Sequence, residues 1–272
     1  MEKINAYAKI NLTLSVLAKR ADGYHDLQSI MHSVSVHDTV YLEKADDICV
    51  SCSLPLPENN TAFRAARAYC EKSGGGVHIR IEKGIPSEAG MGGASADAAA
   101  VLLGLQKIYG AFGWDELMRL GKTIGADVPF CMMGGCCVAE GIGELLTPIN
   151  TIPLDLLVVK GKMGISTPKL FSSITLPLQK ADTEAMVIAV NKGDRVGVAN
   201  NLFNALESEA EKIAPEIAIF RQRMIECGAM GAVMTGSGSA VFGIFESREK
   251  AEDAAKSFSD AEFVSVCRTI LT

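Results

Sequence analysis

A glycine-rich stretch, residues 83–97, is the part of this sequence whose residue types and spacing are best suited to chemistry. It follows residues 77–82, where apolar and polar side chains alternate with the period of a strand. It leads into residues 96–109, an alanine- and leucine-rich run that predicts a helix. Glycines let backbone N–H groups approach an oxygen-rich ligand, and a helix N-terminus adds about half a positive charge. The stretch therefore predicts a phosphate-binding loop, and a tight connection without a ligand is the alternative.

Two common phosphate-binding motifs do not fit the sequence. A dinucleotide fingerprint needs three spaced glycines, and after Gly90 and Gly92 the third position holds Ser95. Gly121-Lys122-Thr123 resembles the end of a P-loop, but the glycine required earlier is Glu116.

Two charged residues in apolar surroundings are candidates for catalysis. Asp127 lies in Gly-Ala-Asp-Val-Pro-Phe, where loss of water could raise its pKa and favour a general base. The alternative for Asp127 is a turn or helix-end aspartate. Lys9 interrupts an apolar strand, where an ammonium group needs a partner, and the alternative is a lysine that faces solvent from an edge strand. Asn11 lies two residues on and so shares the strand face of Lys9.

An aromatic pair follows the Asp-Gly turn of residues 20–23. Tyr24 and His25 offer a ring face and an imidazole, which suit a flat polar base, and we expect the turn to hold both exposed. The alternative is one packed aromatic residue and one surface histidine.

Four segments together resemble the GHMP kinases, the family of galactokinase, homoserine kinase and mevalonate kinase. The first is the glycine-rich stretch. The second is Ala8-Lys9-Ile10-Asn11-Leu12, which is followed by Asp22-Gly23-Tyr24-His25. The others are residues 125–130, followed by 141–144, and Thr235-Gly236-Ser237-Gly238-Ser239-Ala240. The Asp-Gly-Tyr-His element is particular to family members that phosphorylate 4-diphosphocytidyl-2-C-methyl-D-erythritol.

The resemblance implies a reaction and the residues that would carry it. The reaction is transfer of the γ-phosphoryl group of ATP to the 2-hydroxyl of that cytidine diphosphate compound, in non-mevalonate isoprenoid precursor biosynthesis, with Mg²⁺ accompanying ATP. Asp127 would be the base and Lys9 its catalytic partner, and the two are expected to meet. The expected substrate-binding residues are Asn11, Tyr24, His25, Thr167 and Phe171. The expected nucleotide-binding residues are Asn60, Lys83, Pro86, Ser87, Glu88, Ala89, Gly90, Met91, Gly92, Gly93, Ala94, Ser95 and Ala96.

Some positions depart from the family pattern. Ala94 replaces a frequent serine, Met91 replaces leucine, and Gly161 stands in a segment that lacks an expected proline. Asn201 lies in another altered motif, Asn-Asn-Leu-Phe-Asn. None of these changes removes a candidate catalytic group, so we expect them to affect substrate fit and kinetics.

Composition limits the class of protein. Of the 272 residues, 48% are hydrophobic and 21% charged, which is typical of a globular enzyme. With 26 basic and 32 acidic residues the net charge is −6, which argues against nucleic-acid or membrane-surface partners. With no long apolar run, we expect a cytoplasmic protein whose partner is a small molecule. The eight cysteines lack a zinc-site pattern, so we expect mostly buried, reduced thiols, and the oligomeric state stays open.

The elements that must position these residues predict an α+β fold. Strands are expected over 6–17, 27–36, 39–42 and 77–82, and helices over 61–70, 96–109 and 114–124, the first capped by Asn60. Apolar runs restart after Pro148–Pro153, which places a domain boundary between residues 152 and 153. Beyond it, strands at 154–159, 232–234, 240–245 and 263–267 and helices at 183–190, 207–223 and 249–258 predict an antiparallel sheet with helices on one side. The resemblance implies a ribosomal protein S5 domain 2-like domain over 1–152, a ferredoxin-like domain over 153–272, and an active site in the cleft between them.

Two rival functions stay open. One is the same chemistry on another alcohol, and the other is a nucleotide-binding protein without catalysis. Asp-Gly-Tyr-His and Phe171 count against the first, and the presence of both Lys9 and Asp127 counts against the second.

Overall fold

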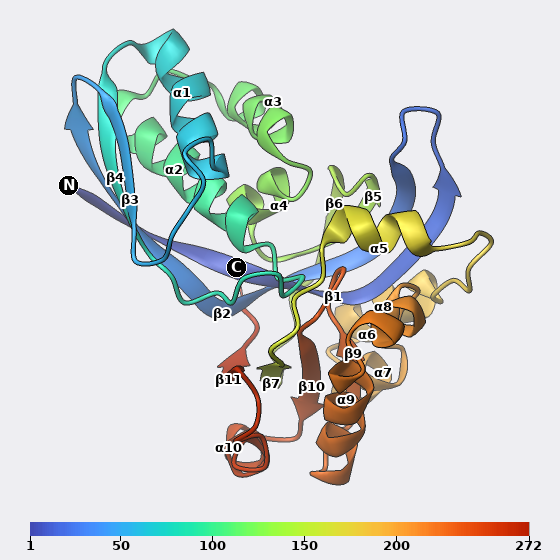
Figure 1. The fold of residues 1–272 in the computed structure, drawn as a ribbon. Coiled ribbons are helices and arrows are strands. Elements are labelled where there is room, and N and C mark those ends of the chain that lie inside the picture. The colour runs from blue at the N-terminus through green and yellow to red at the C-terminus, as the bar shows by residue number, and fades with distance from the viewer. Residues whose placement is uncertain (272) are drawn as a thin grey trace. The chain divides into compact units, whose positions relative to one another are not determined.

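A computed structural model describes residues 1–271 of the chain (Figure 1). The described residues form two compact units, and neither is continuous in sequence. Unit 1 consists of Met1–Ala8, Val36–Ile85 and Gly92–Gly134. Unit 2 consists of Lys9–Ser35, Pro86–Met91 and the described residues from Gly135 onward. The domain boundary expected between residues 152 and 153 stays a prediction.

Unit 1 is built from helices packed on a small sheet. The sheet contains β3 (Ile48–Cys52), β4 (Gly76–Glu82) and the C-terminal part of β2 (His25–Ala45), with β4 parallel to β3 and antiparallel to β2. The helices are α1 (Thr61–Ser73), α2 (Gly93–Tyr109), α3 (Trp114–Ile124) and α4 (Val128–Met133). Close packing uses small residues, and at Gly104 of α2 a Cβ would overlap the side chain of Leu42 on β2.

Most elements expected in unit 1 are present. The bounds of α3 are as expected, and Asn60 caps α1 by accepting a hydrogen bond from the Phe63 backbone N–H. The two strands expected at 27–36 and 39–42 are wrong in one respect, because β2 is a single strand through His37 and Asp38. A buried aspartate is tolerated there because backbone N–H groups and a lysine satisfy its carboxylate.

Unit 2 contains the expected antiparallel sheet, which has four strands in the order β11-β7-β10-β9. These strands are β7 (Asp155–Lys160), β9 (Gly231–Met234), β10 (Val241–Phe245) and β11 (Phe263–Arg268). Elsewhere in the unit, β5 (Cys136–Gly141) pairs with β6 (Leu145–Ile149) and with residues 27–32 of β2. β1 (Glu2–Lys19) pairs in parallel with the short β8 (Phe203–Asn204) at Thr13 and Leu14.

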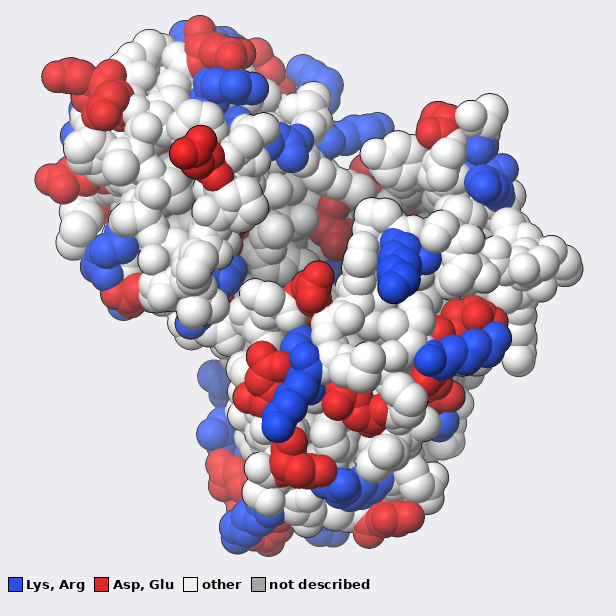
Figure 2. Space-filling view, viewed as in Figure 1, with Lys and Arg blue, Asp and Glu red and all other residues white. Residues whose placement is uncertain are grey.

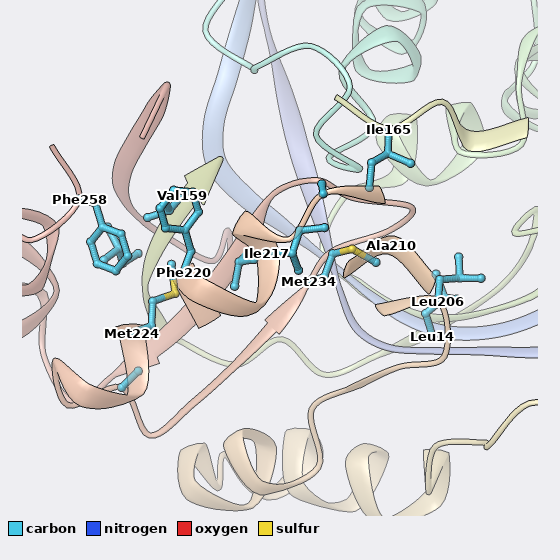
Figure 3. Packing of buried hydrophobic residues seen from close by; sticks show 14 of the residues in the cluster. Leu14, Val159, Ile165, Leu206, Ala210, Ile217, Phe220, Met224, Met234 and Phe258 are labelled. Carbon is cyan, nitrogen blue, oxygen red and sulfur yellow. The ribbon is translucent and has the colours of Figure 1, made fainter. Parts of the chain in front are cut away.

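The core of unit 2 lies between its antiparallel sheet and its helices (Figure 3). Ile217, Phe220 and Met224 from α9 (Glu216–Glu226) pack in the same cluster as Val159 of β7 and Phe258 after α10 (Arg248–Ala255). The remaining helices of the unit are α5 (Thr167–Ser173), α6 (Thr183–Lys192), α7 (Arg195–Asn200) and α8 (Glu207–Ile213).

The helix expected over 207–223 is wrong, since α8 ends at Ile213 and α9 begins at Glu216. Ala214, before Pro215, has φ −129° and ψ 84°, outside the helical region. Proline disfavours a helical conformation in the residue before it, and its ring removes a backbone donor.

The thiols are less uniformly buried than expected. Cys70, Cys136, Cys137 and Cys267 are buried, but Cys49 is exposed because its side chain lies on the outer face of β3. Burial raises the pKa of the Cys136 thiol, which keeps it protonated and unreactive.

The surface and the helices add two observations on possible partners. On the face shown in Figure 2, acidic and basic side chains are interspersed, so this face has no broad basic surface. Within residues 1–271, no helix has both the length and the apolar character needed to cross a bilayer.

Candidate active site

The glycine-rich loop leads directly into α2. Gly90 and Gly92 have φ of 71° and 73°, a region that favours glycine, and Gly92 is the N-cap of the helix. In the described helix no side chain caps this end, so backbone N–H groups remain to meet an anion. Pro86–Met91, with Ser87, Glu88 and Ala89, belongs to unit 2, whereas Gly92 to Ala96 belong to unit 1.

Helix α2 begins earlier than expected, at Gly93. Ala94 and Ser95 therefore lie in its first turn, and Ser95 donates its backbone N–H to the Gly92 carbonyl. The Thr61 hydroxyl donates to the Ala94 carbonyl at 2.7 Å, which ties the turn to the start of α1.

In unit 2 the loop is braced by a second glycine-rich loop, residues 235–239. Ser239 and Ala240 donate backbone N–H groups to the carbonyls of Glu88 and Ala89. A Cβ on Gly90 would overlap the Thr235 carbonyl oxygen. Residues 235–239 also connect the antiparallel strands β9 and β10, so this hairpin loop and the glycine-rich loop are joined by backbone hydrogen bonds.

Lys9 and Asn11 lie together on β1, as their spacing predicts. The Lys9 Nζ atom donates to the Asn11 Oδ1 atom at 2.6 Å, and the two residues are only 5% and 3% exposed. The side chain of Lys9 is buried, and its backbone N–H donates to the Met91 carbonyl, so the alternative of a solvent-facing lysine on an edge strand is wrong. A buried ammonium held by a carbonyl oxygen is placed to act on an anion.

The aromatic residues expected around a base are all in unit 2. Tyr24 is 60% exposed, and its backbone N–H is held by Asp22 in the Asp-Gly turn. His25 is 9% exposed, so the expectation of an exposed histidine is wrong. It is buried because its ring packs against Phe171 of α5, with centroids 5.2 Å apart. Thr167, at the start of α5, shares a 2.6 Å hydrogen bond with the Ser237 hydroxyl.

Asp127 is in unit 1, at the N-cap position of α4. Its carboxylate makes no capping hydrogen bond within this helix, and its place in a turn at a helix end agrees with the alternative of a turn or helix-end aspartate, so its role as a base stays a prediction. Lys9 belongs to unit 2, and the expected meeting of Lys9 with Asp127 stays a prediction.

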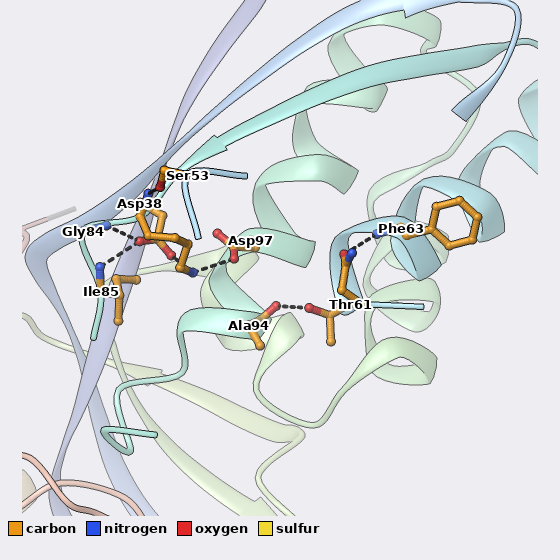
Figure 4. A network of polar contacts seen from close by, with 10 residues as sticks. Asp38, Ser53, Thr61, Phe63, Gly84, Ile85, Ala94 and Asp97 are labelled. Atoms are coloured by element: carbon orange, nitrogen blue, oxygen red, sulfur yellow. Dashed lines mark hydrogen bonds and ion pairs between the residues drawn. The ribbon is translucent and has the colours of Figure 1, made fainter. Parts of the chain in front are cut away.

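Lys83 lies in a buried ion-pair network (Figure 4). Its ammonium group binds the carboxylates of Asp38 and Asp97, the latter at 2.8 Å. Burial lowers the pKa of Lys83, but the attraction of Asp97 and Asp38 outweighs it and leaves the pKa above its ordinary value. Burial also raises the pKa of Asp97 to about 7, against the effect of Lys83. The other oxygen of Asp38 accepts the N–H groups of Gly84 and Ile85 and so fixes the entry to the loop.

The sequence did not identify three residues that contact candidate site residues, namely Asp38 and Asp97 beside Lys83 and Ser29 beside Asn11. Asp38 and Asp97 interrupt apolar runs in the same way as Lys9, and that signal was available for both. Ser29 had no such signal, because a serine in a strand is ordinary, and its hydrogen bond to Asn11 depends on the pairing of strands.

Residues 1–271 hold no group of three or more histidine, cysteine, aspartate or glutamate side chains arranged to bind a metal ion.

Family models and known proteins match most of the chain. The model for the GHMP kinases N terminal domain matches residues 60–135, and that for the GHMP kinases C terminal matches residues 186–264. The 4-diphosphocytidyl-2-C-methyl-D-erythritol kinase of Caldicellulosiruptor saccharolyticus is 43% identical over 263 residues, which cover 93% of this chain and 91% of the relative. The kinase of the same name from Acetivibrio thermocellus is 41% identical, with 97% of each chain covered.

Solved structures agree with this similarity. A crystal structure of 4-(cytidine 5′-diphospho)-2C-methyl-D-erythritol kinase matches with a TM-score of 0.86 and 35% identity, covering 98% of this chain and 99% of the other. Homoserine kinase from Cytophaga hutchinsonii matches with a TM-score of 0.72 at 17% identity, covering 100% of this chain and 96% of the other, and so shows the shared fold alone.

Proposed function

This chain belongs to the GHMP kinase family, and from that premise we propose that it phosphorylates 4-diphosphocytidyl-2-C-methyl-D-erythritol. ATP donates its γ-phosphoryl group to the 2-hydroxyl, giving the 2-phosphate and ADP, as a step of non-mevalonate isoprenoid precursor biosynthesis. The relatives named above carry the name of this kinase, and the similarity extends over nearly the whole chain.

The acceptor assignment depends most on the aromatic residues of unit 2. Tyr24 is exposed on a fixed turn, and the rings of His25 and Phe171 pack 5.2 Å apart. A cytosine ring is flat and polar at its edge, so it can stack on an aromatic face while imidazole or hydroxyl groups bind its edge. An acceptor alcohol without a base has no ring to stack on Tyr24, His25 or Phe171.

On the nucleotide side, the loop and the start of α2 would bind the phosphates through backbone N–H groups. Asn60 and Lys83 would lie near the adenosine, and the Asp38 carboxylate would keep Lys83 and the loop entry in place. When bound with ATP, Mg²⁺ would supply charge neutralisation at the phosphate oxygens.

The chemical step needs a proton acceptor and positive charge. Asp127 would take the proton of the 2-hydroxyl while the hydroxyl oxygen forms a bond to the γ-phosphorus of ATP. The bond between that phosphorus and the leaving ADP oxygen would break. The Lys9 ammonium, held by the Asn11 carbonyl, would stabilise the negative charge on the transferred group. Asn11 and Thr167 would orient the acceptor.

Incubation of the purified protein with Mg-ATP and 4-diphosphocytidyl-2-C-methyl-D-erythritol tests the proposal. We expect equal amounts of ADP and phosphorylated product, with no turnover of homoserine or mevalonate. Turnover of one of those alcohols instead would give the chain a different acceptor, and ATP binding without transfer to any alcohol would make it a nucleotide-binding protein.

A further inference from the structure

A buried chain of hydrogen bonds in unit 2 extends beyond Lys9 and Asn11. The Asn11 side-chain amide donates to the Ser29 hydroxyl at 2.8 Å, and that hydroxyl donates to the Thr13 carbonyl at 2.6 Å. The Thr235 hydroxyl accepts the Asn11 backbone N–H at 3.0 Å. Ser29, Asn11 and Thr235 are at most 4% exposed, so solvent does not compete for these bonds.

The proton count fixes the direction of each bond. A serine hydroxyl has one proton, and at Ser29 the Thr13 carbonyl takes it, because a carbonyl can only accept. The Ser29 oxygen is therefore left as an acceptor, and it must face the NH₂ group of Asn11. That choice turns the Asn11 carbonyl oxygen toward Lys9, where it accepts from the ammonium.

The reversed orientation of the Asn11 amide is excluded by the same count. In that orientation the Asn11 carbonyl oxygen would face the Ser29 oxygen, an acceptor against an acceptor with no proton between them. The Asn11 NH₂ group would face the Lys9 ammonium, a donor against a donor. Buried polar groups without partners are strongly disfavoured. The Ser29 oxygen as acceptor, and the Lys9 ammonium and the Thr235 hydroxyl as donors to Asn11 Oδ1, therefore all require the same orientation, and Ser29 is the partner that holds the NH₂ group.

We propose that Ser29 is a positioning residue, which anchors the NH₂ group of the Asn11 amide and so holds the Asn11 carbonyl oxygen against the Lys9 ammonium. The inference rests on the proposed function for the role of Lys9, but the orientation itself does not. In this role Ser29 acts through its hydrogen bond to Asn11.

Kinetics of Ser29→Ala test the proposal against a matched serine. Ser15 is fully buried on β1, and its hydroxyl accepts the backbone N–H of Ala181, with no bond to Asn11. We expect Ser29→Ala to lower kcat about tenfold with KM for ATP unchanged, and Ser15→Ala to leave kcat within about twofold of the wild type. Equal losses in the two variants, or none in Ser29→Ala, would overturn the inference.

A double-mutant cycle then separates positioning from a general structural role. If Ser29 acts through Asn11, Ser29→Ala lowers kcat by less than about twofold when Asn11 is already alanine. A full tenfold loss in that background contradicts the inference while leaving the proposed function intact.

A readout without activity covers the case in which the cytidine compound is not turned over. The side-chain amide protons of Asn11, assigned by their loss in Asn11→Ala, are expected to exchange slowly with solvent and at least tenfold faster in Ser29→Ala. Unchanged exchange would overturn the inference whatever the substrate.

Discussion

At the scale of single residues, charged and aromatic side chains of the candidate site are held by hydrogen bonds, ion pairs and ring contacts. Lys9 is held by Asn11, Lys83 by two carboxylates, and His25 by the ring of Phe171. Asp127 stands at a helix end without capping it. Each of these roles can be tested by a substitution that leaves the fold in place.

Asp127→Asn keeps the size of the side chain and removes its ability to accept a proton at neutral pH. We expect kcat to fall by about 10²–10⁴-fold, the usual contribution of a general base, with ATP affinity within about twofold. Steady-state kinetics and calorimetric titration with ATP measure both. Asp115→Asn, at an exposed aspartate of α3 in the same unit, is the control, and a variant at position 127 that keeps a tenth of the activity would not support a base.

Tyr24→Ala removes a ring that is 60% exposed, so the fold should lose little stability. Stacking of a base on an aromatic ring contributes about 1–3 kcal/mol, so we expect KM for the cytidine substrate to rise about tenfold or more while KM for ATP is unchanged. Trp114→Ala, at a ring 51% exposed in unit 1, should change neither constant. Equal changes in both KM values would argue against a base-binding role.

At the scale of elements, the glycine-rich loop is held by hydrogen bonds from distant parts of the chain. The loop of residues 235–239 binds the backbone of Glu88 and Ala89, and Asp38 of β2 binds the backbone at Gly84 and Ile85. Helix α2 thus receives a loop whose path is fixed within each unit by bonds to distant parts of the chain.

Gly90→Ala tests this brace against a matched glycine. Gly90 and Gly110 both have positive φ, 71° and 63°, so alanine costs about 1–2 kcal/mol of backbone strain at either position. A Cβ at Gly110 meets nothing within 4 Å, whereas at Gly90 it would overlap the backbone of the bracing loop. We expect kcat/KM for ATP to fall about 100-fold in Gly90→Ala and less than threefold in Gly110→Ala. Similar losses in both variants would mean that strain alone matters.

At the scale of the whole molecule, each unit holds part of the candidate site, and each is assembled from segments far apart in sequence. Unit 1 holds Asp127 and the Asp38–Lys83–Asp97 network, and unit 2 holds Lys9, Asn11 and the aromatic set. The buried network also makes the stability of the fold depend on pH.

Asp97 has a pKa raised to about 7 in the fold, above its ordinary value near 4. The folded state therefore binds this proton up to a higher pH than the unfolded state does. The contribution of the protonated Asp97 carboxyl to the free energy of unfolding is complete below about pH 4 and is lost as the pH rises to about 7. We expect the free energy of unfolding of the wild type, relative to Asp97→Asn, to fall by about 1–2 kcal/mol between pH 5 and pH 8. Urea unfolding of both proteins at each pH measures it, and a difference independent of pH would mean that Asp97 is ionised throughout.

The sequence by itself determined the local structure and the chemical class. The alternation along β4, the Asn60 cap, the bounds of α3 and the shared strand face of Lys9 and Asn11 all follow from interactions within a few residues. The glycine-rich loop before a helix predicted phosphate, and motifs spread along the chain predicted the family.

Only the tertiary structure decided the partners of these groups. Burial of His25 by Phe171, the carboxylates around Lys83 and the hydroxyl of Ser29 that orients Asn11 depend on strand pairing and helix packing. The sequence also did not predict the continuous β2 or the break at Pro215. β2 continues through Asp38 because the backbone N–H of Gly84, just after β4, donates to the buried Asp38 carboxylate. Local propensity carries no information on which distant atoms satisfy a buried polar group, and that information exists only once the chain has folded.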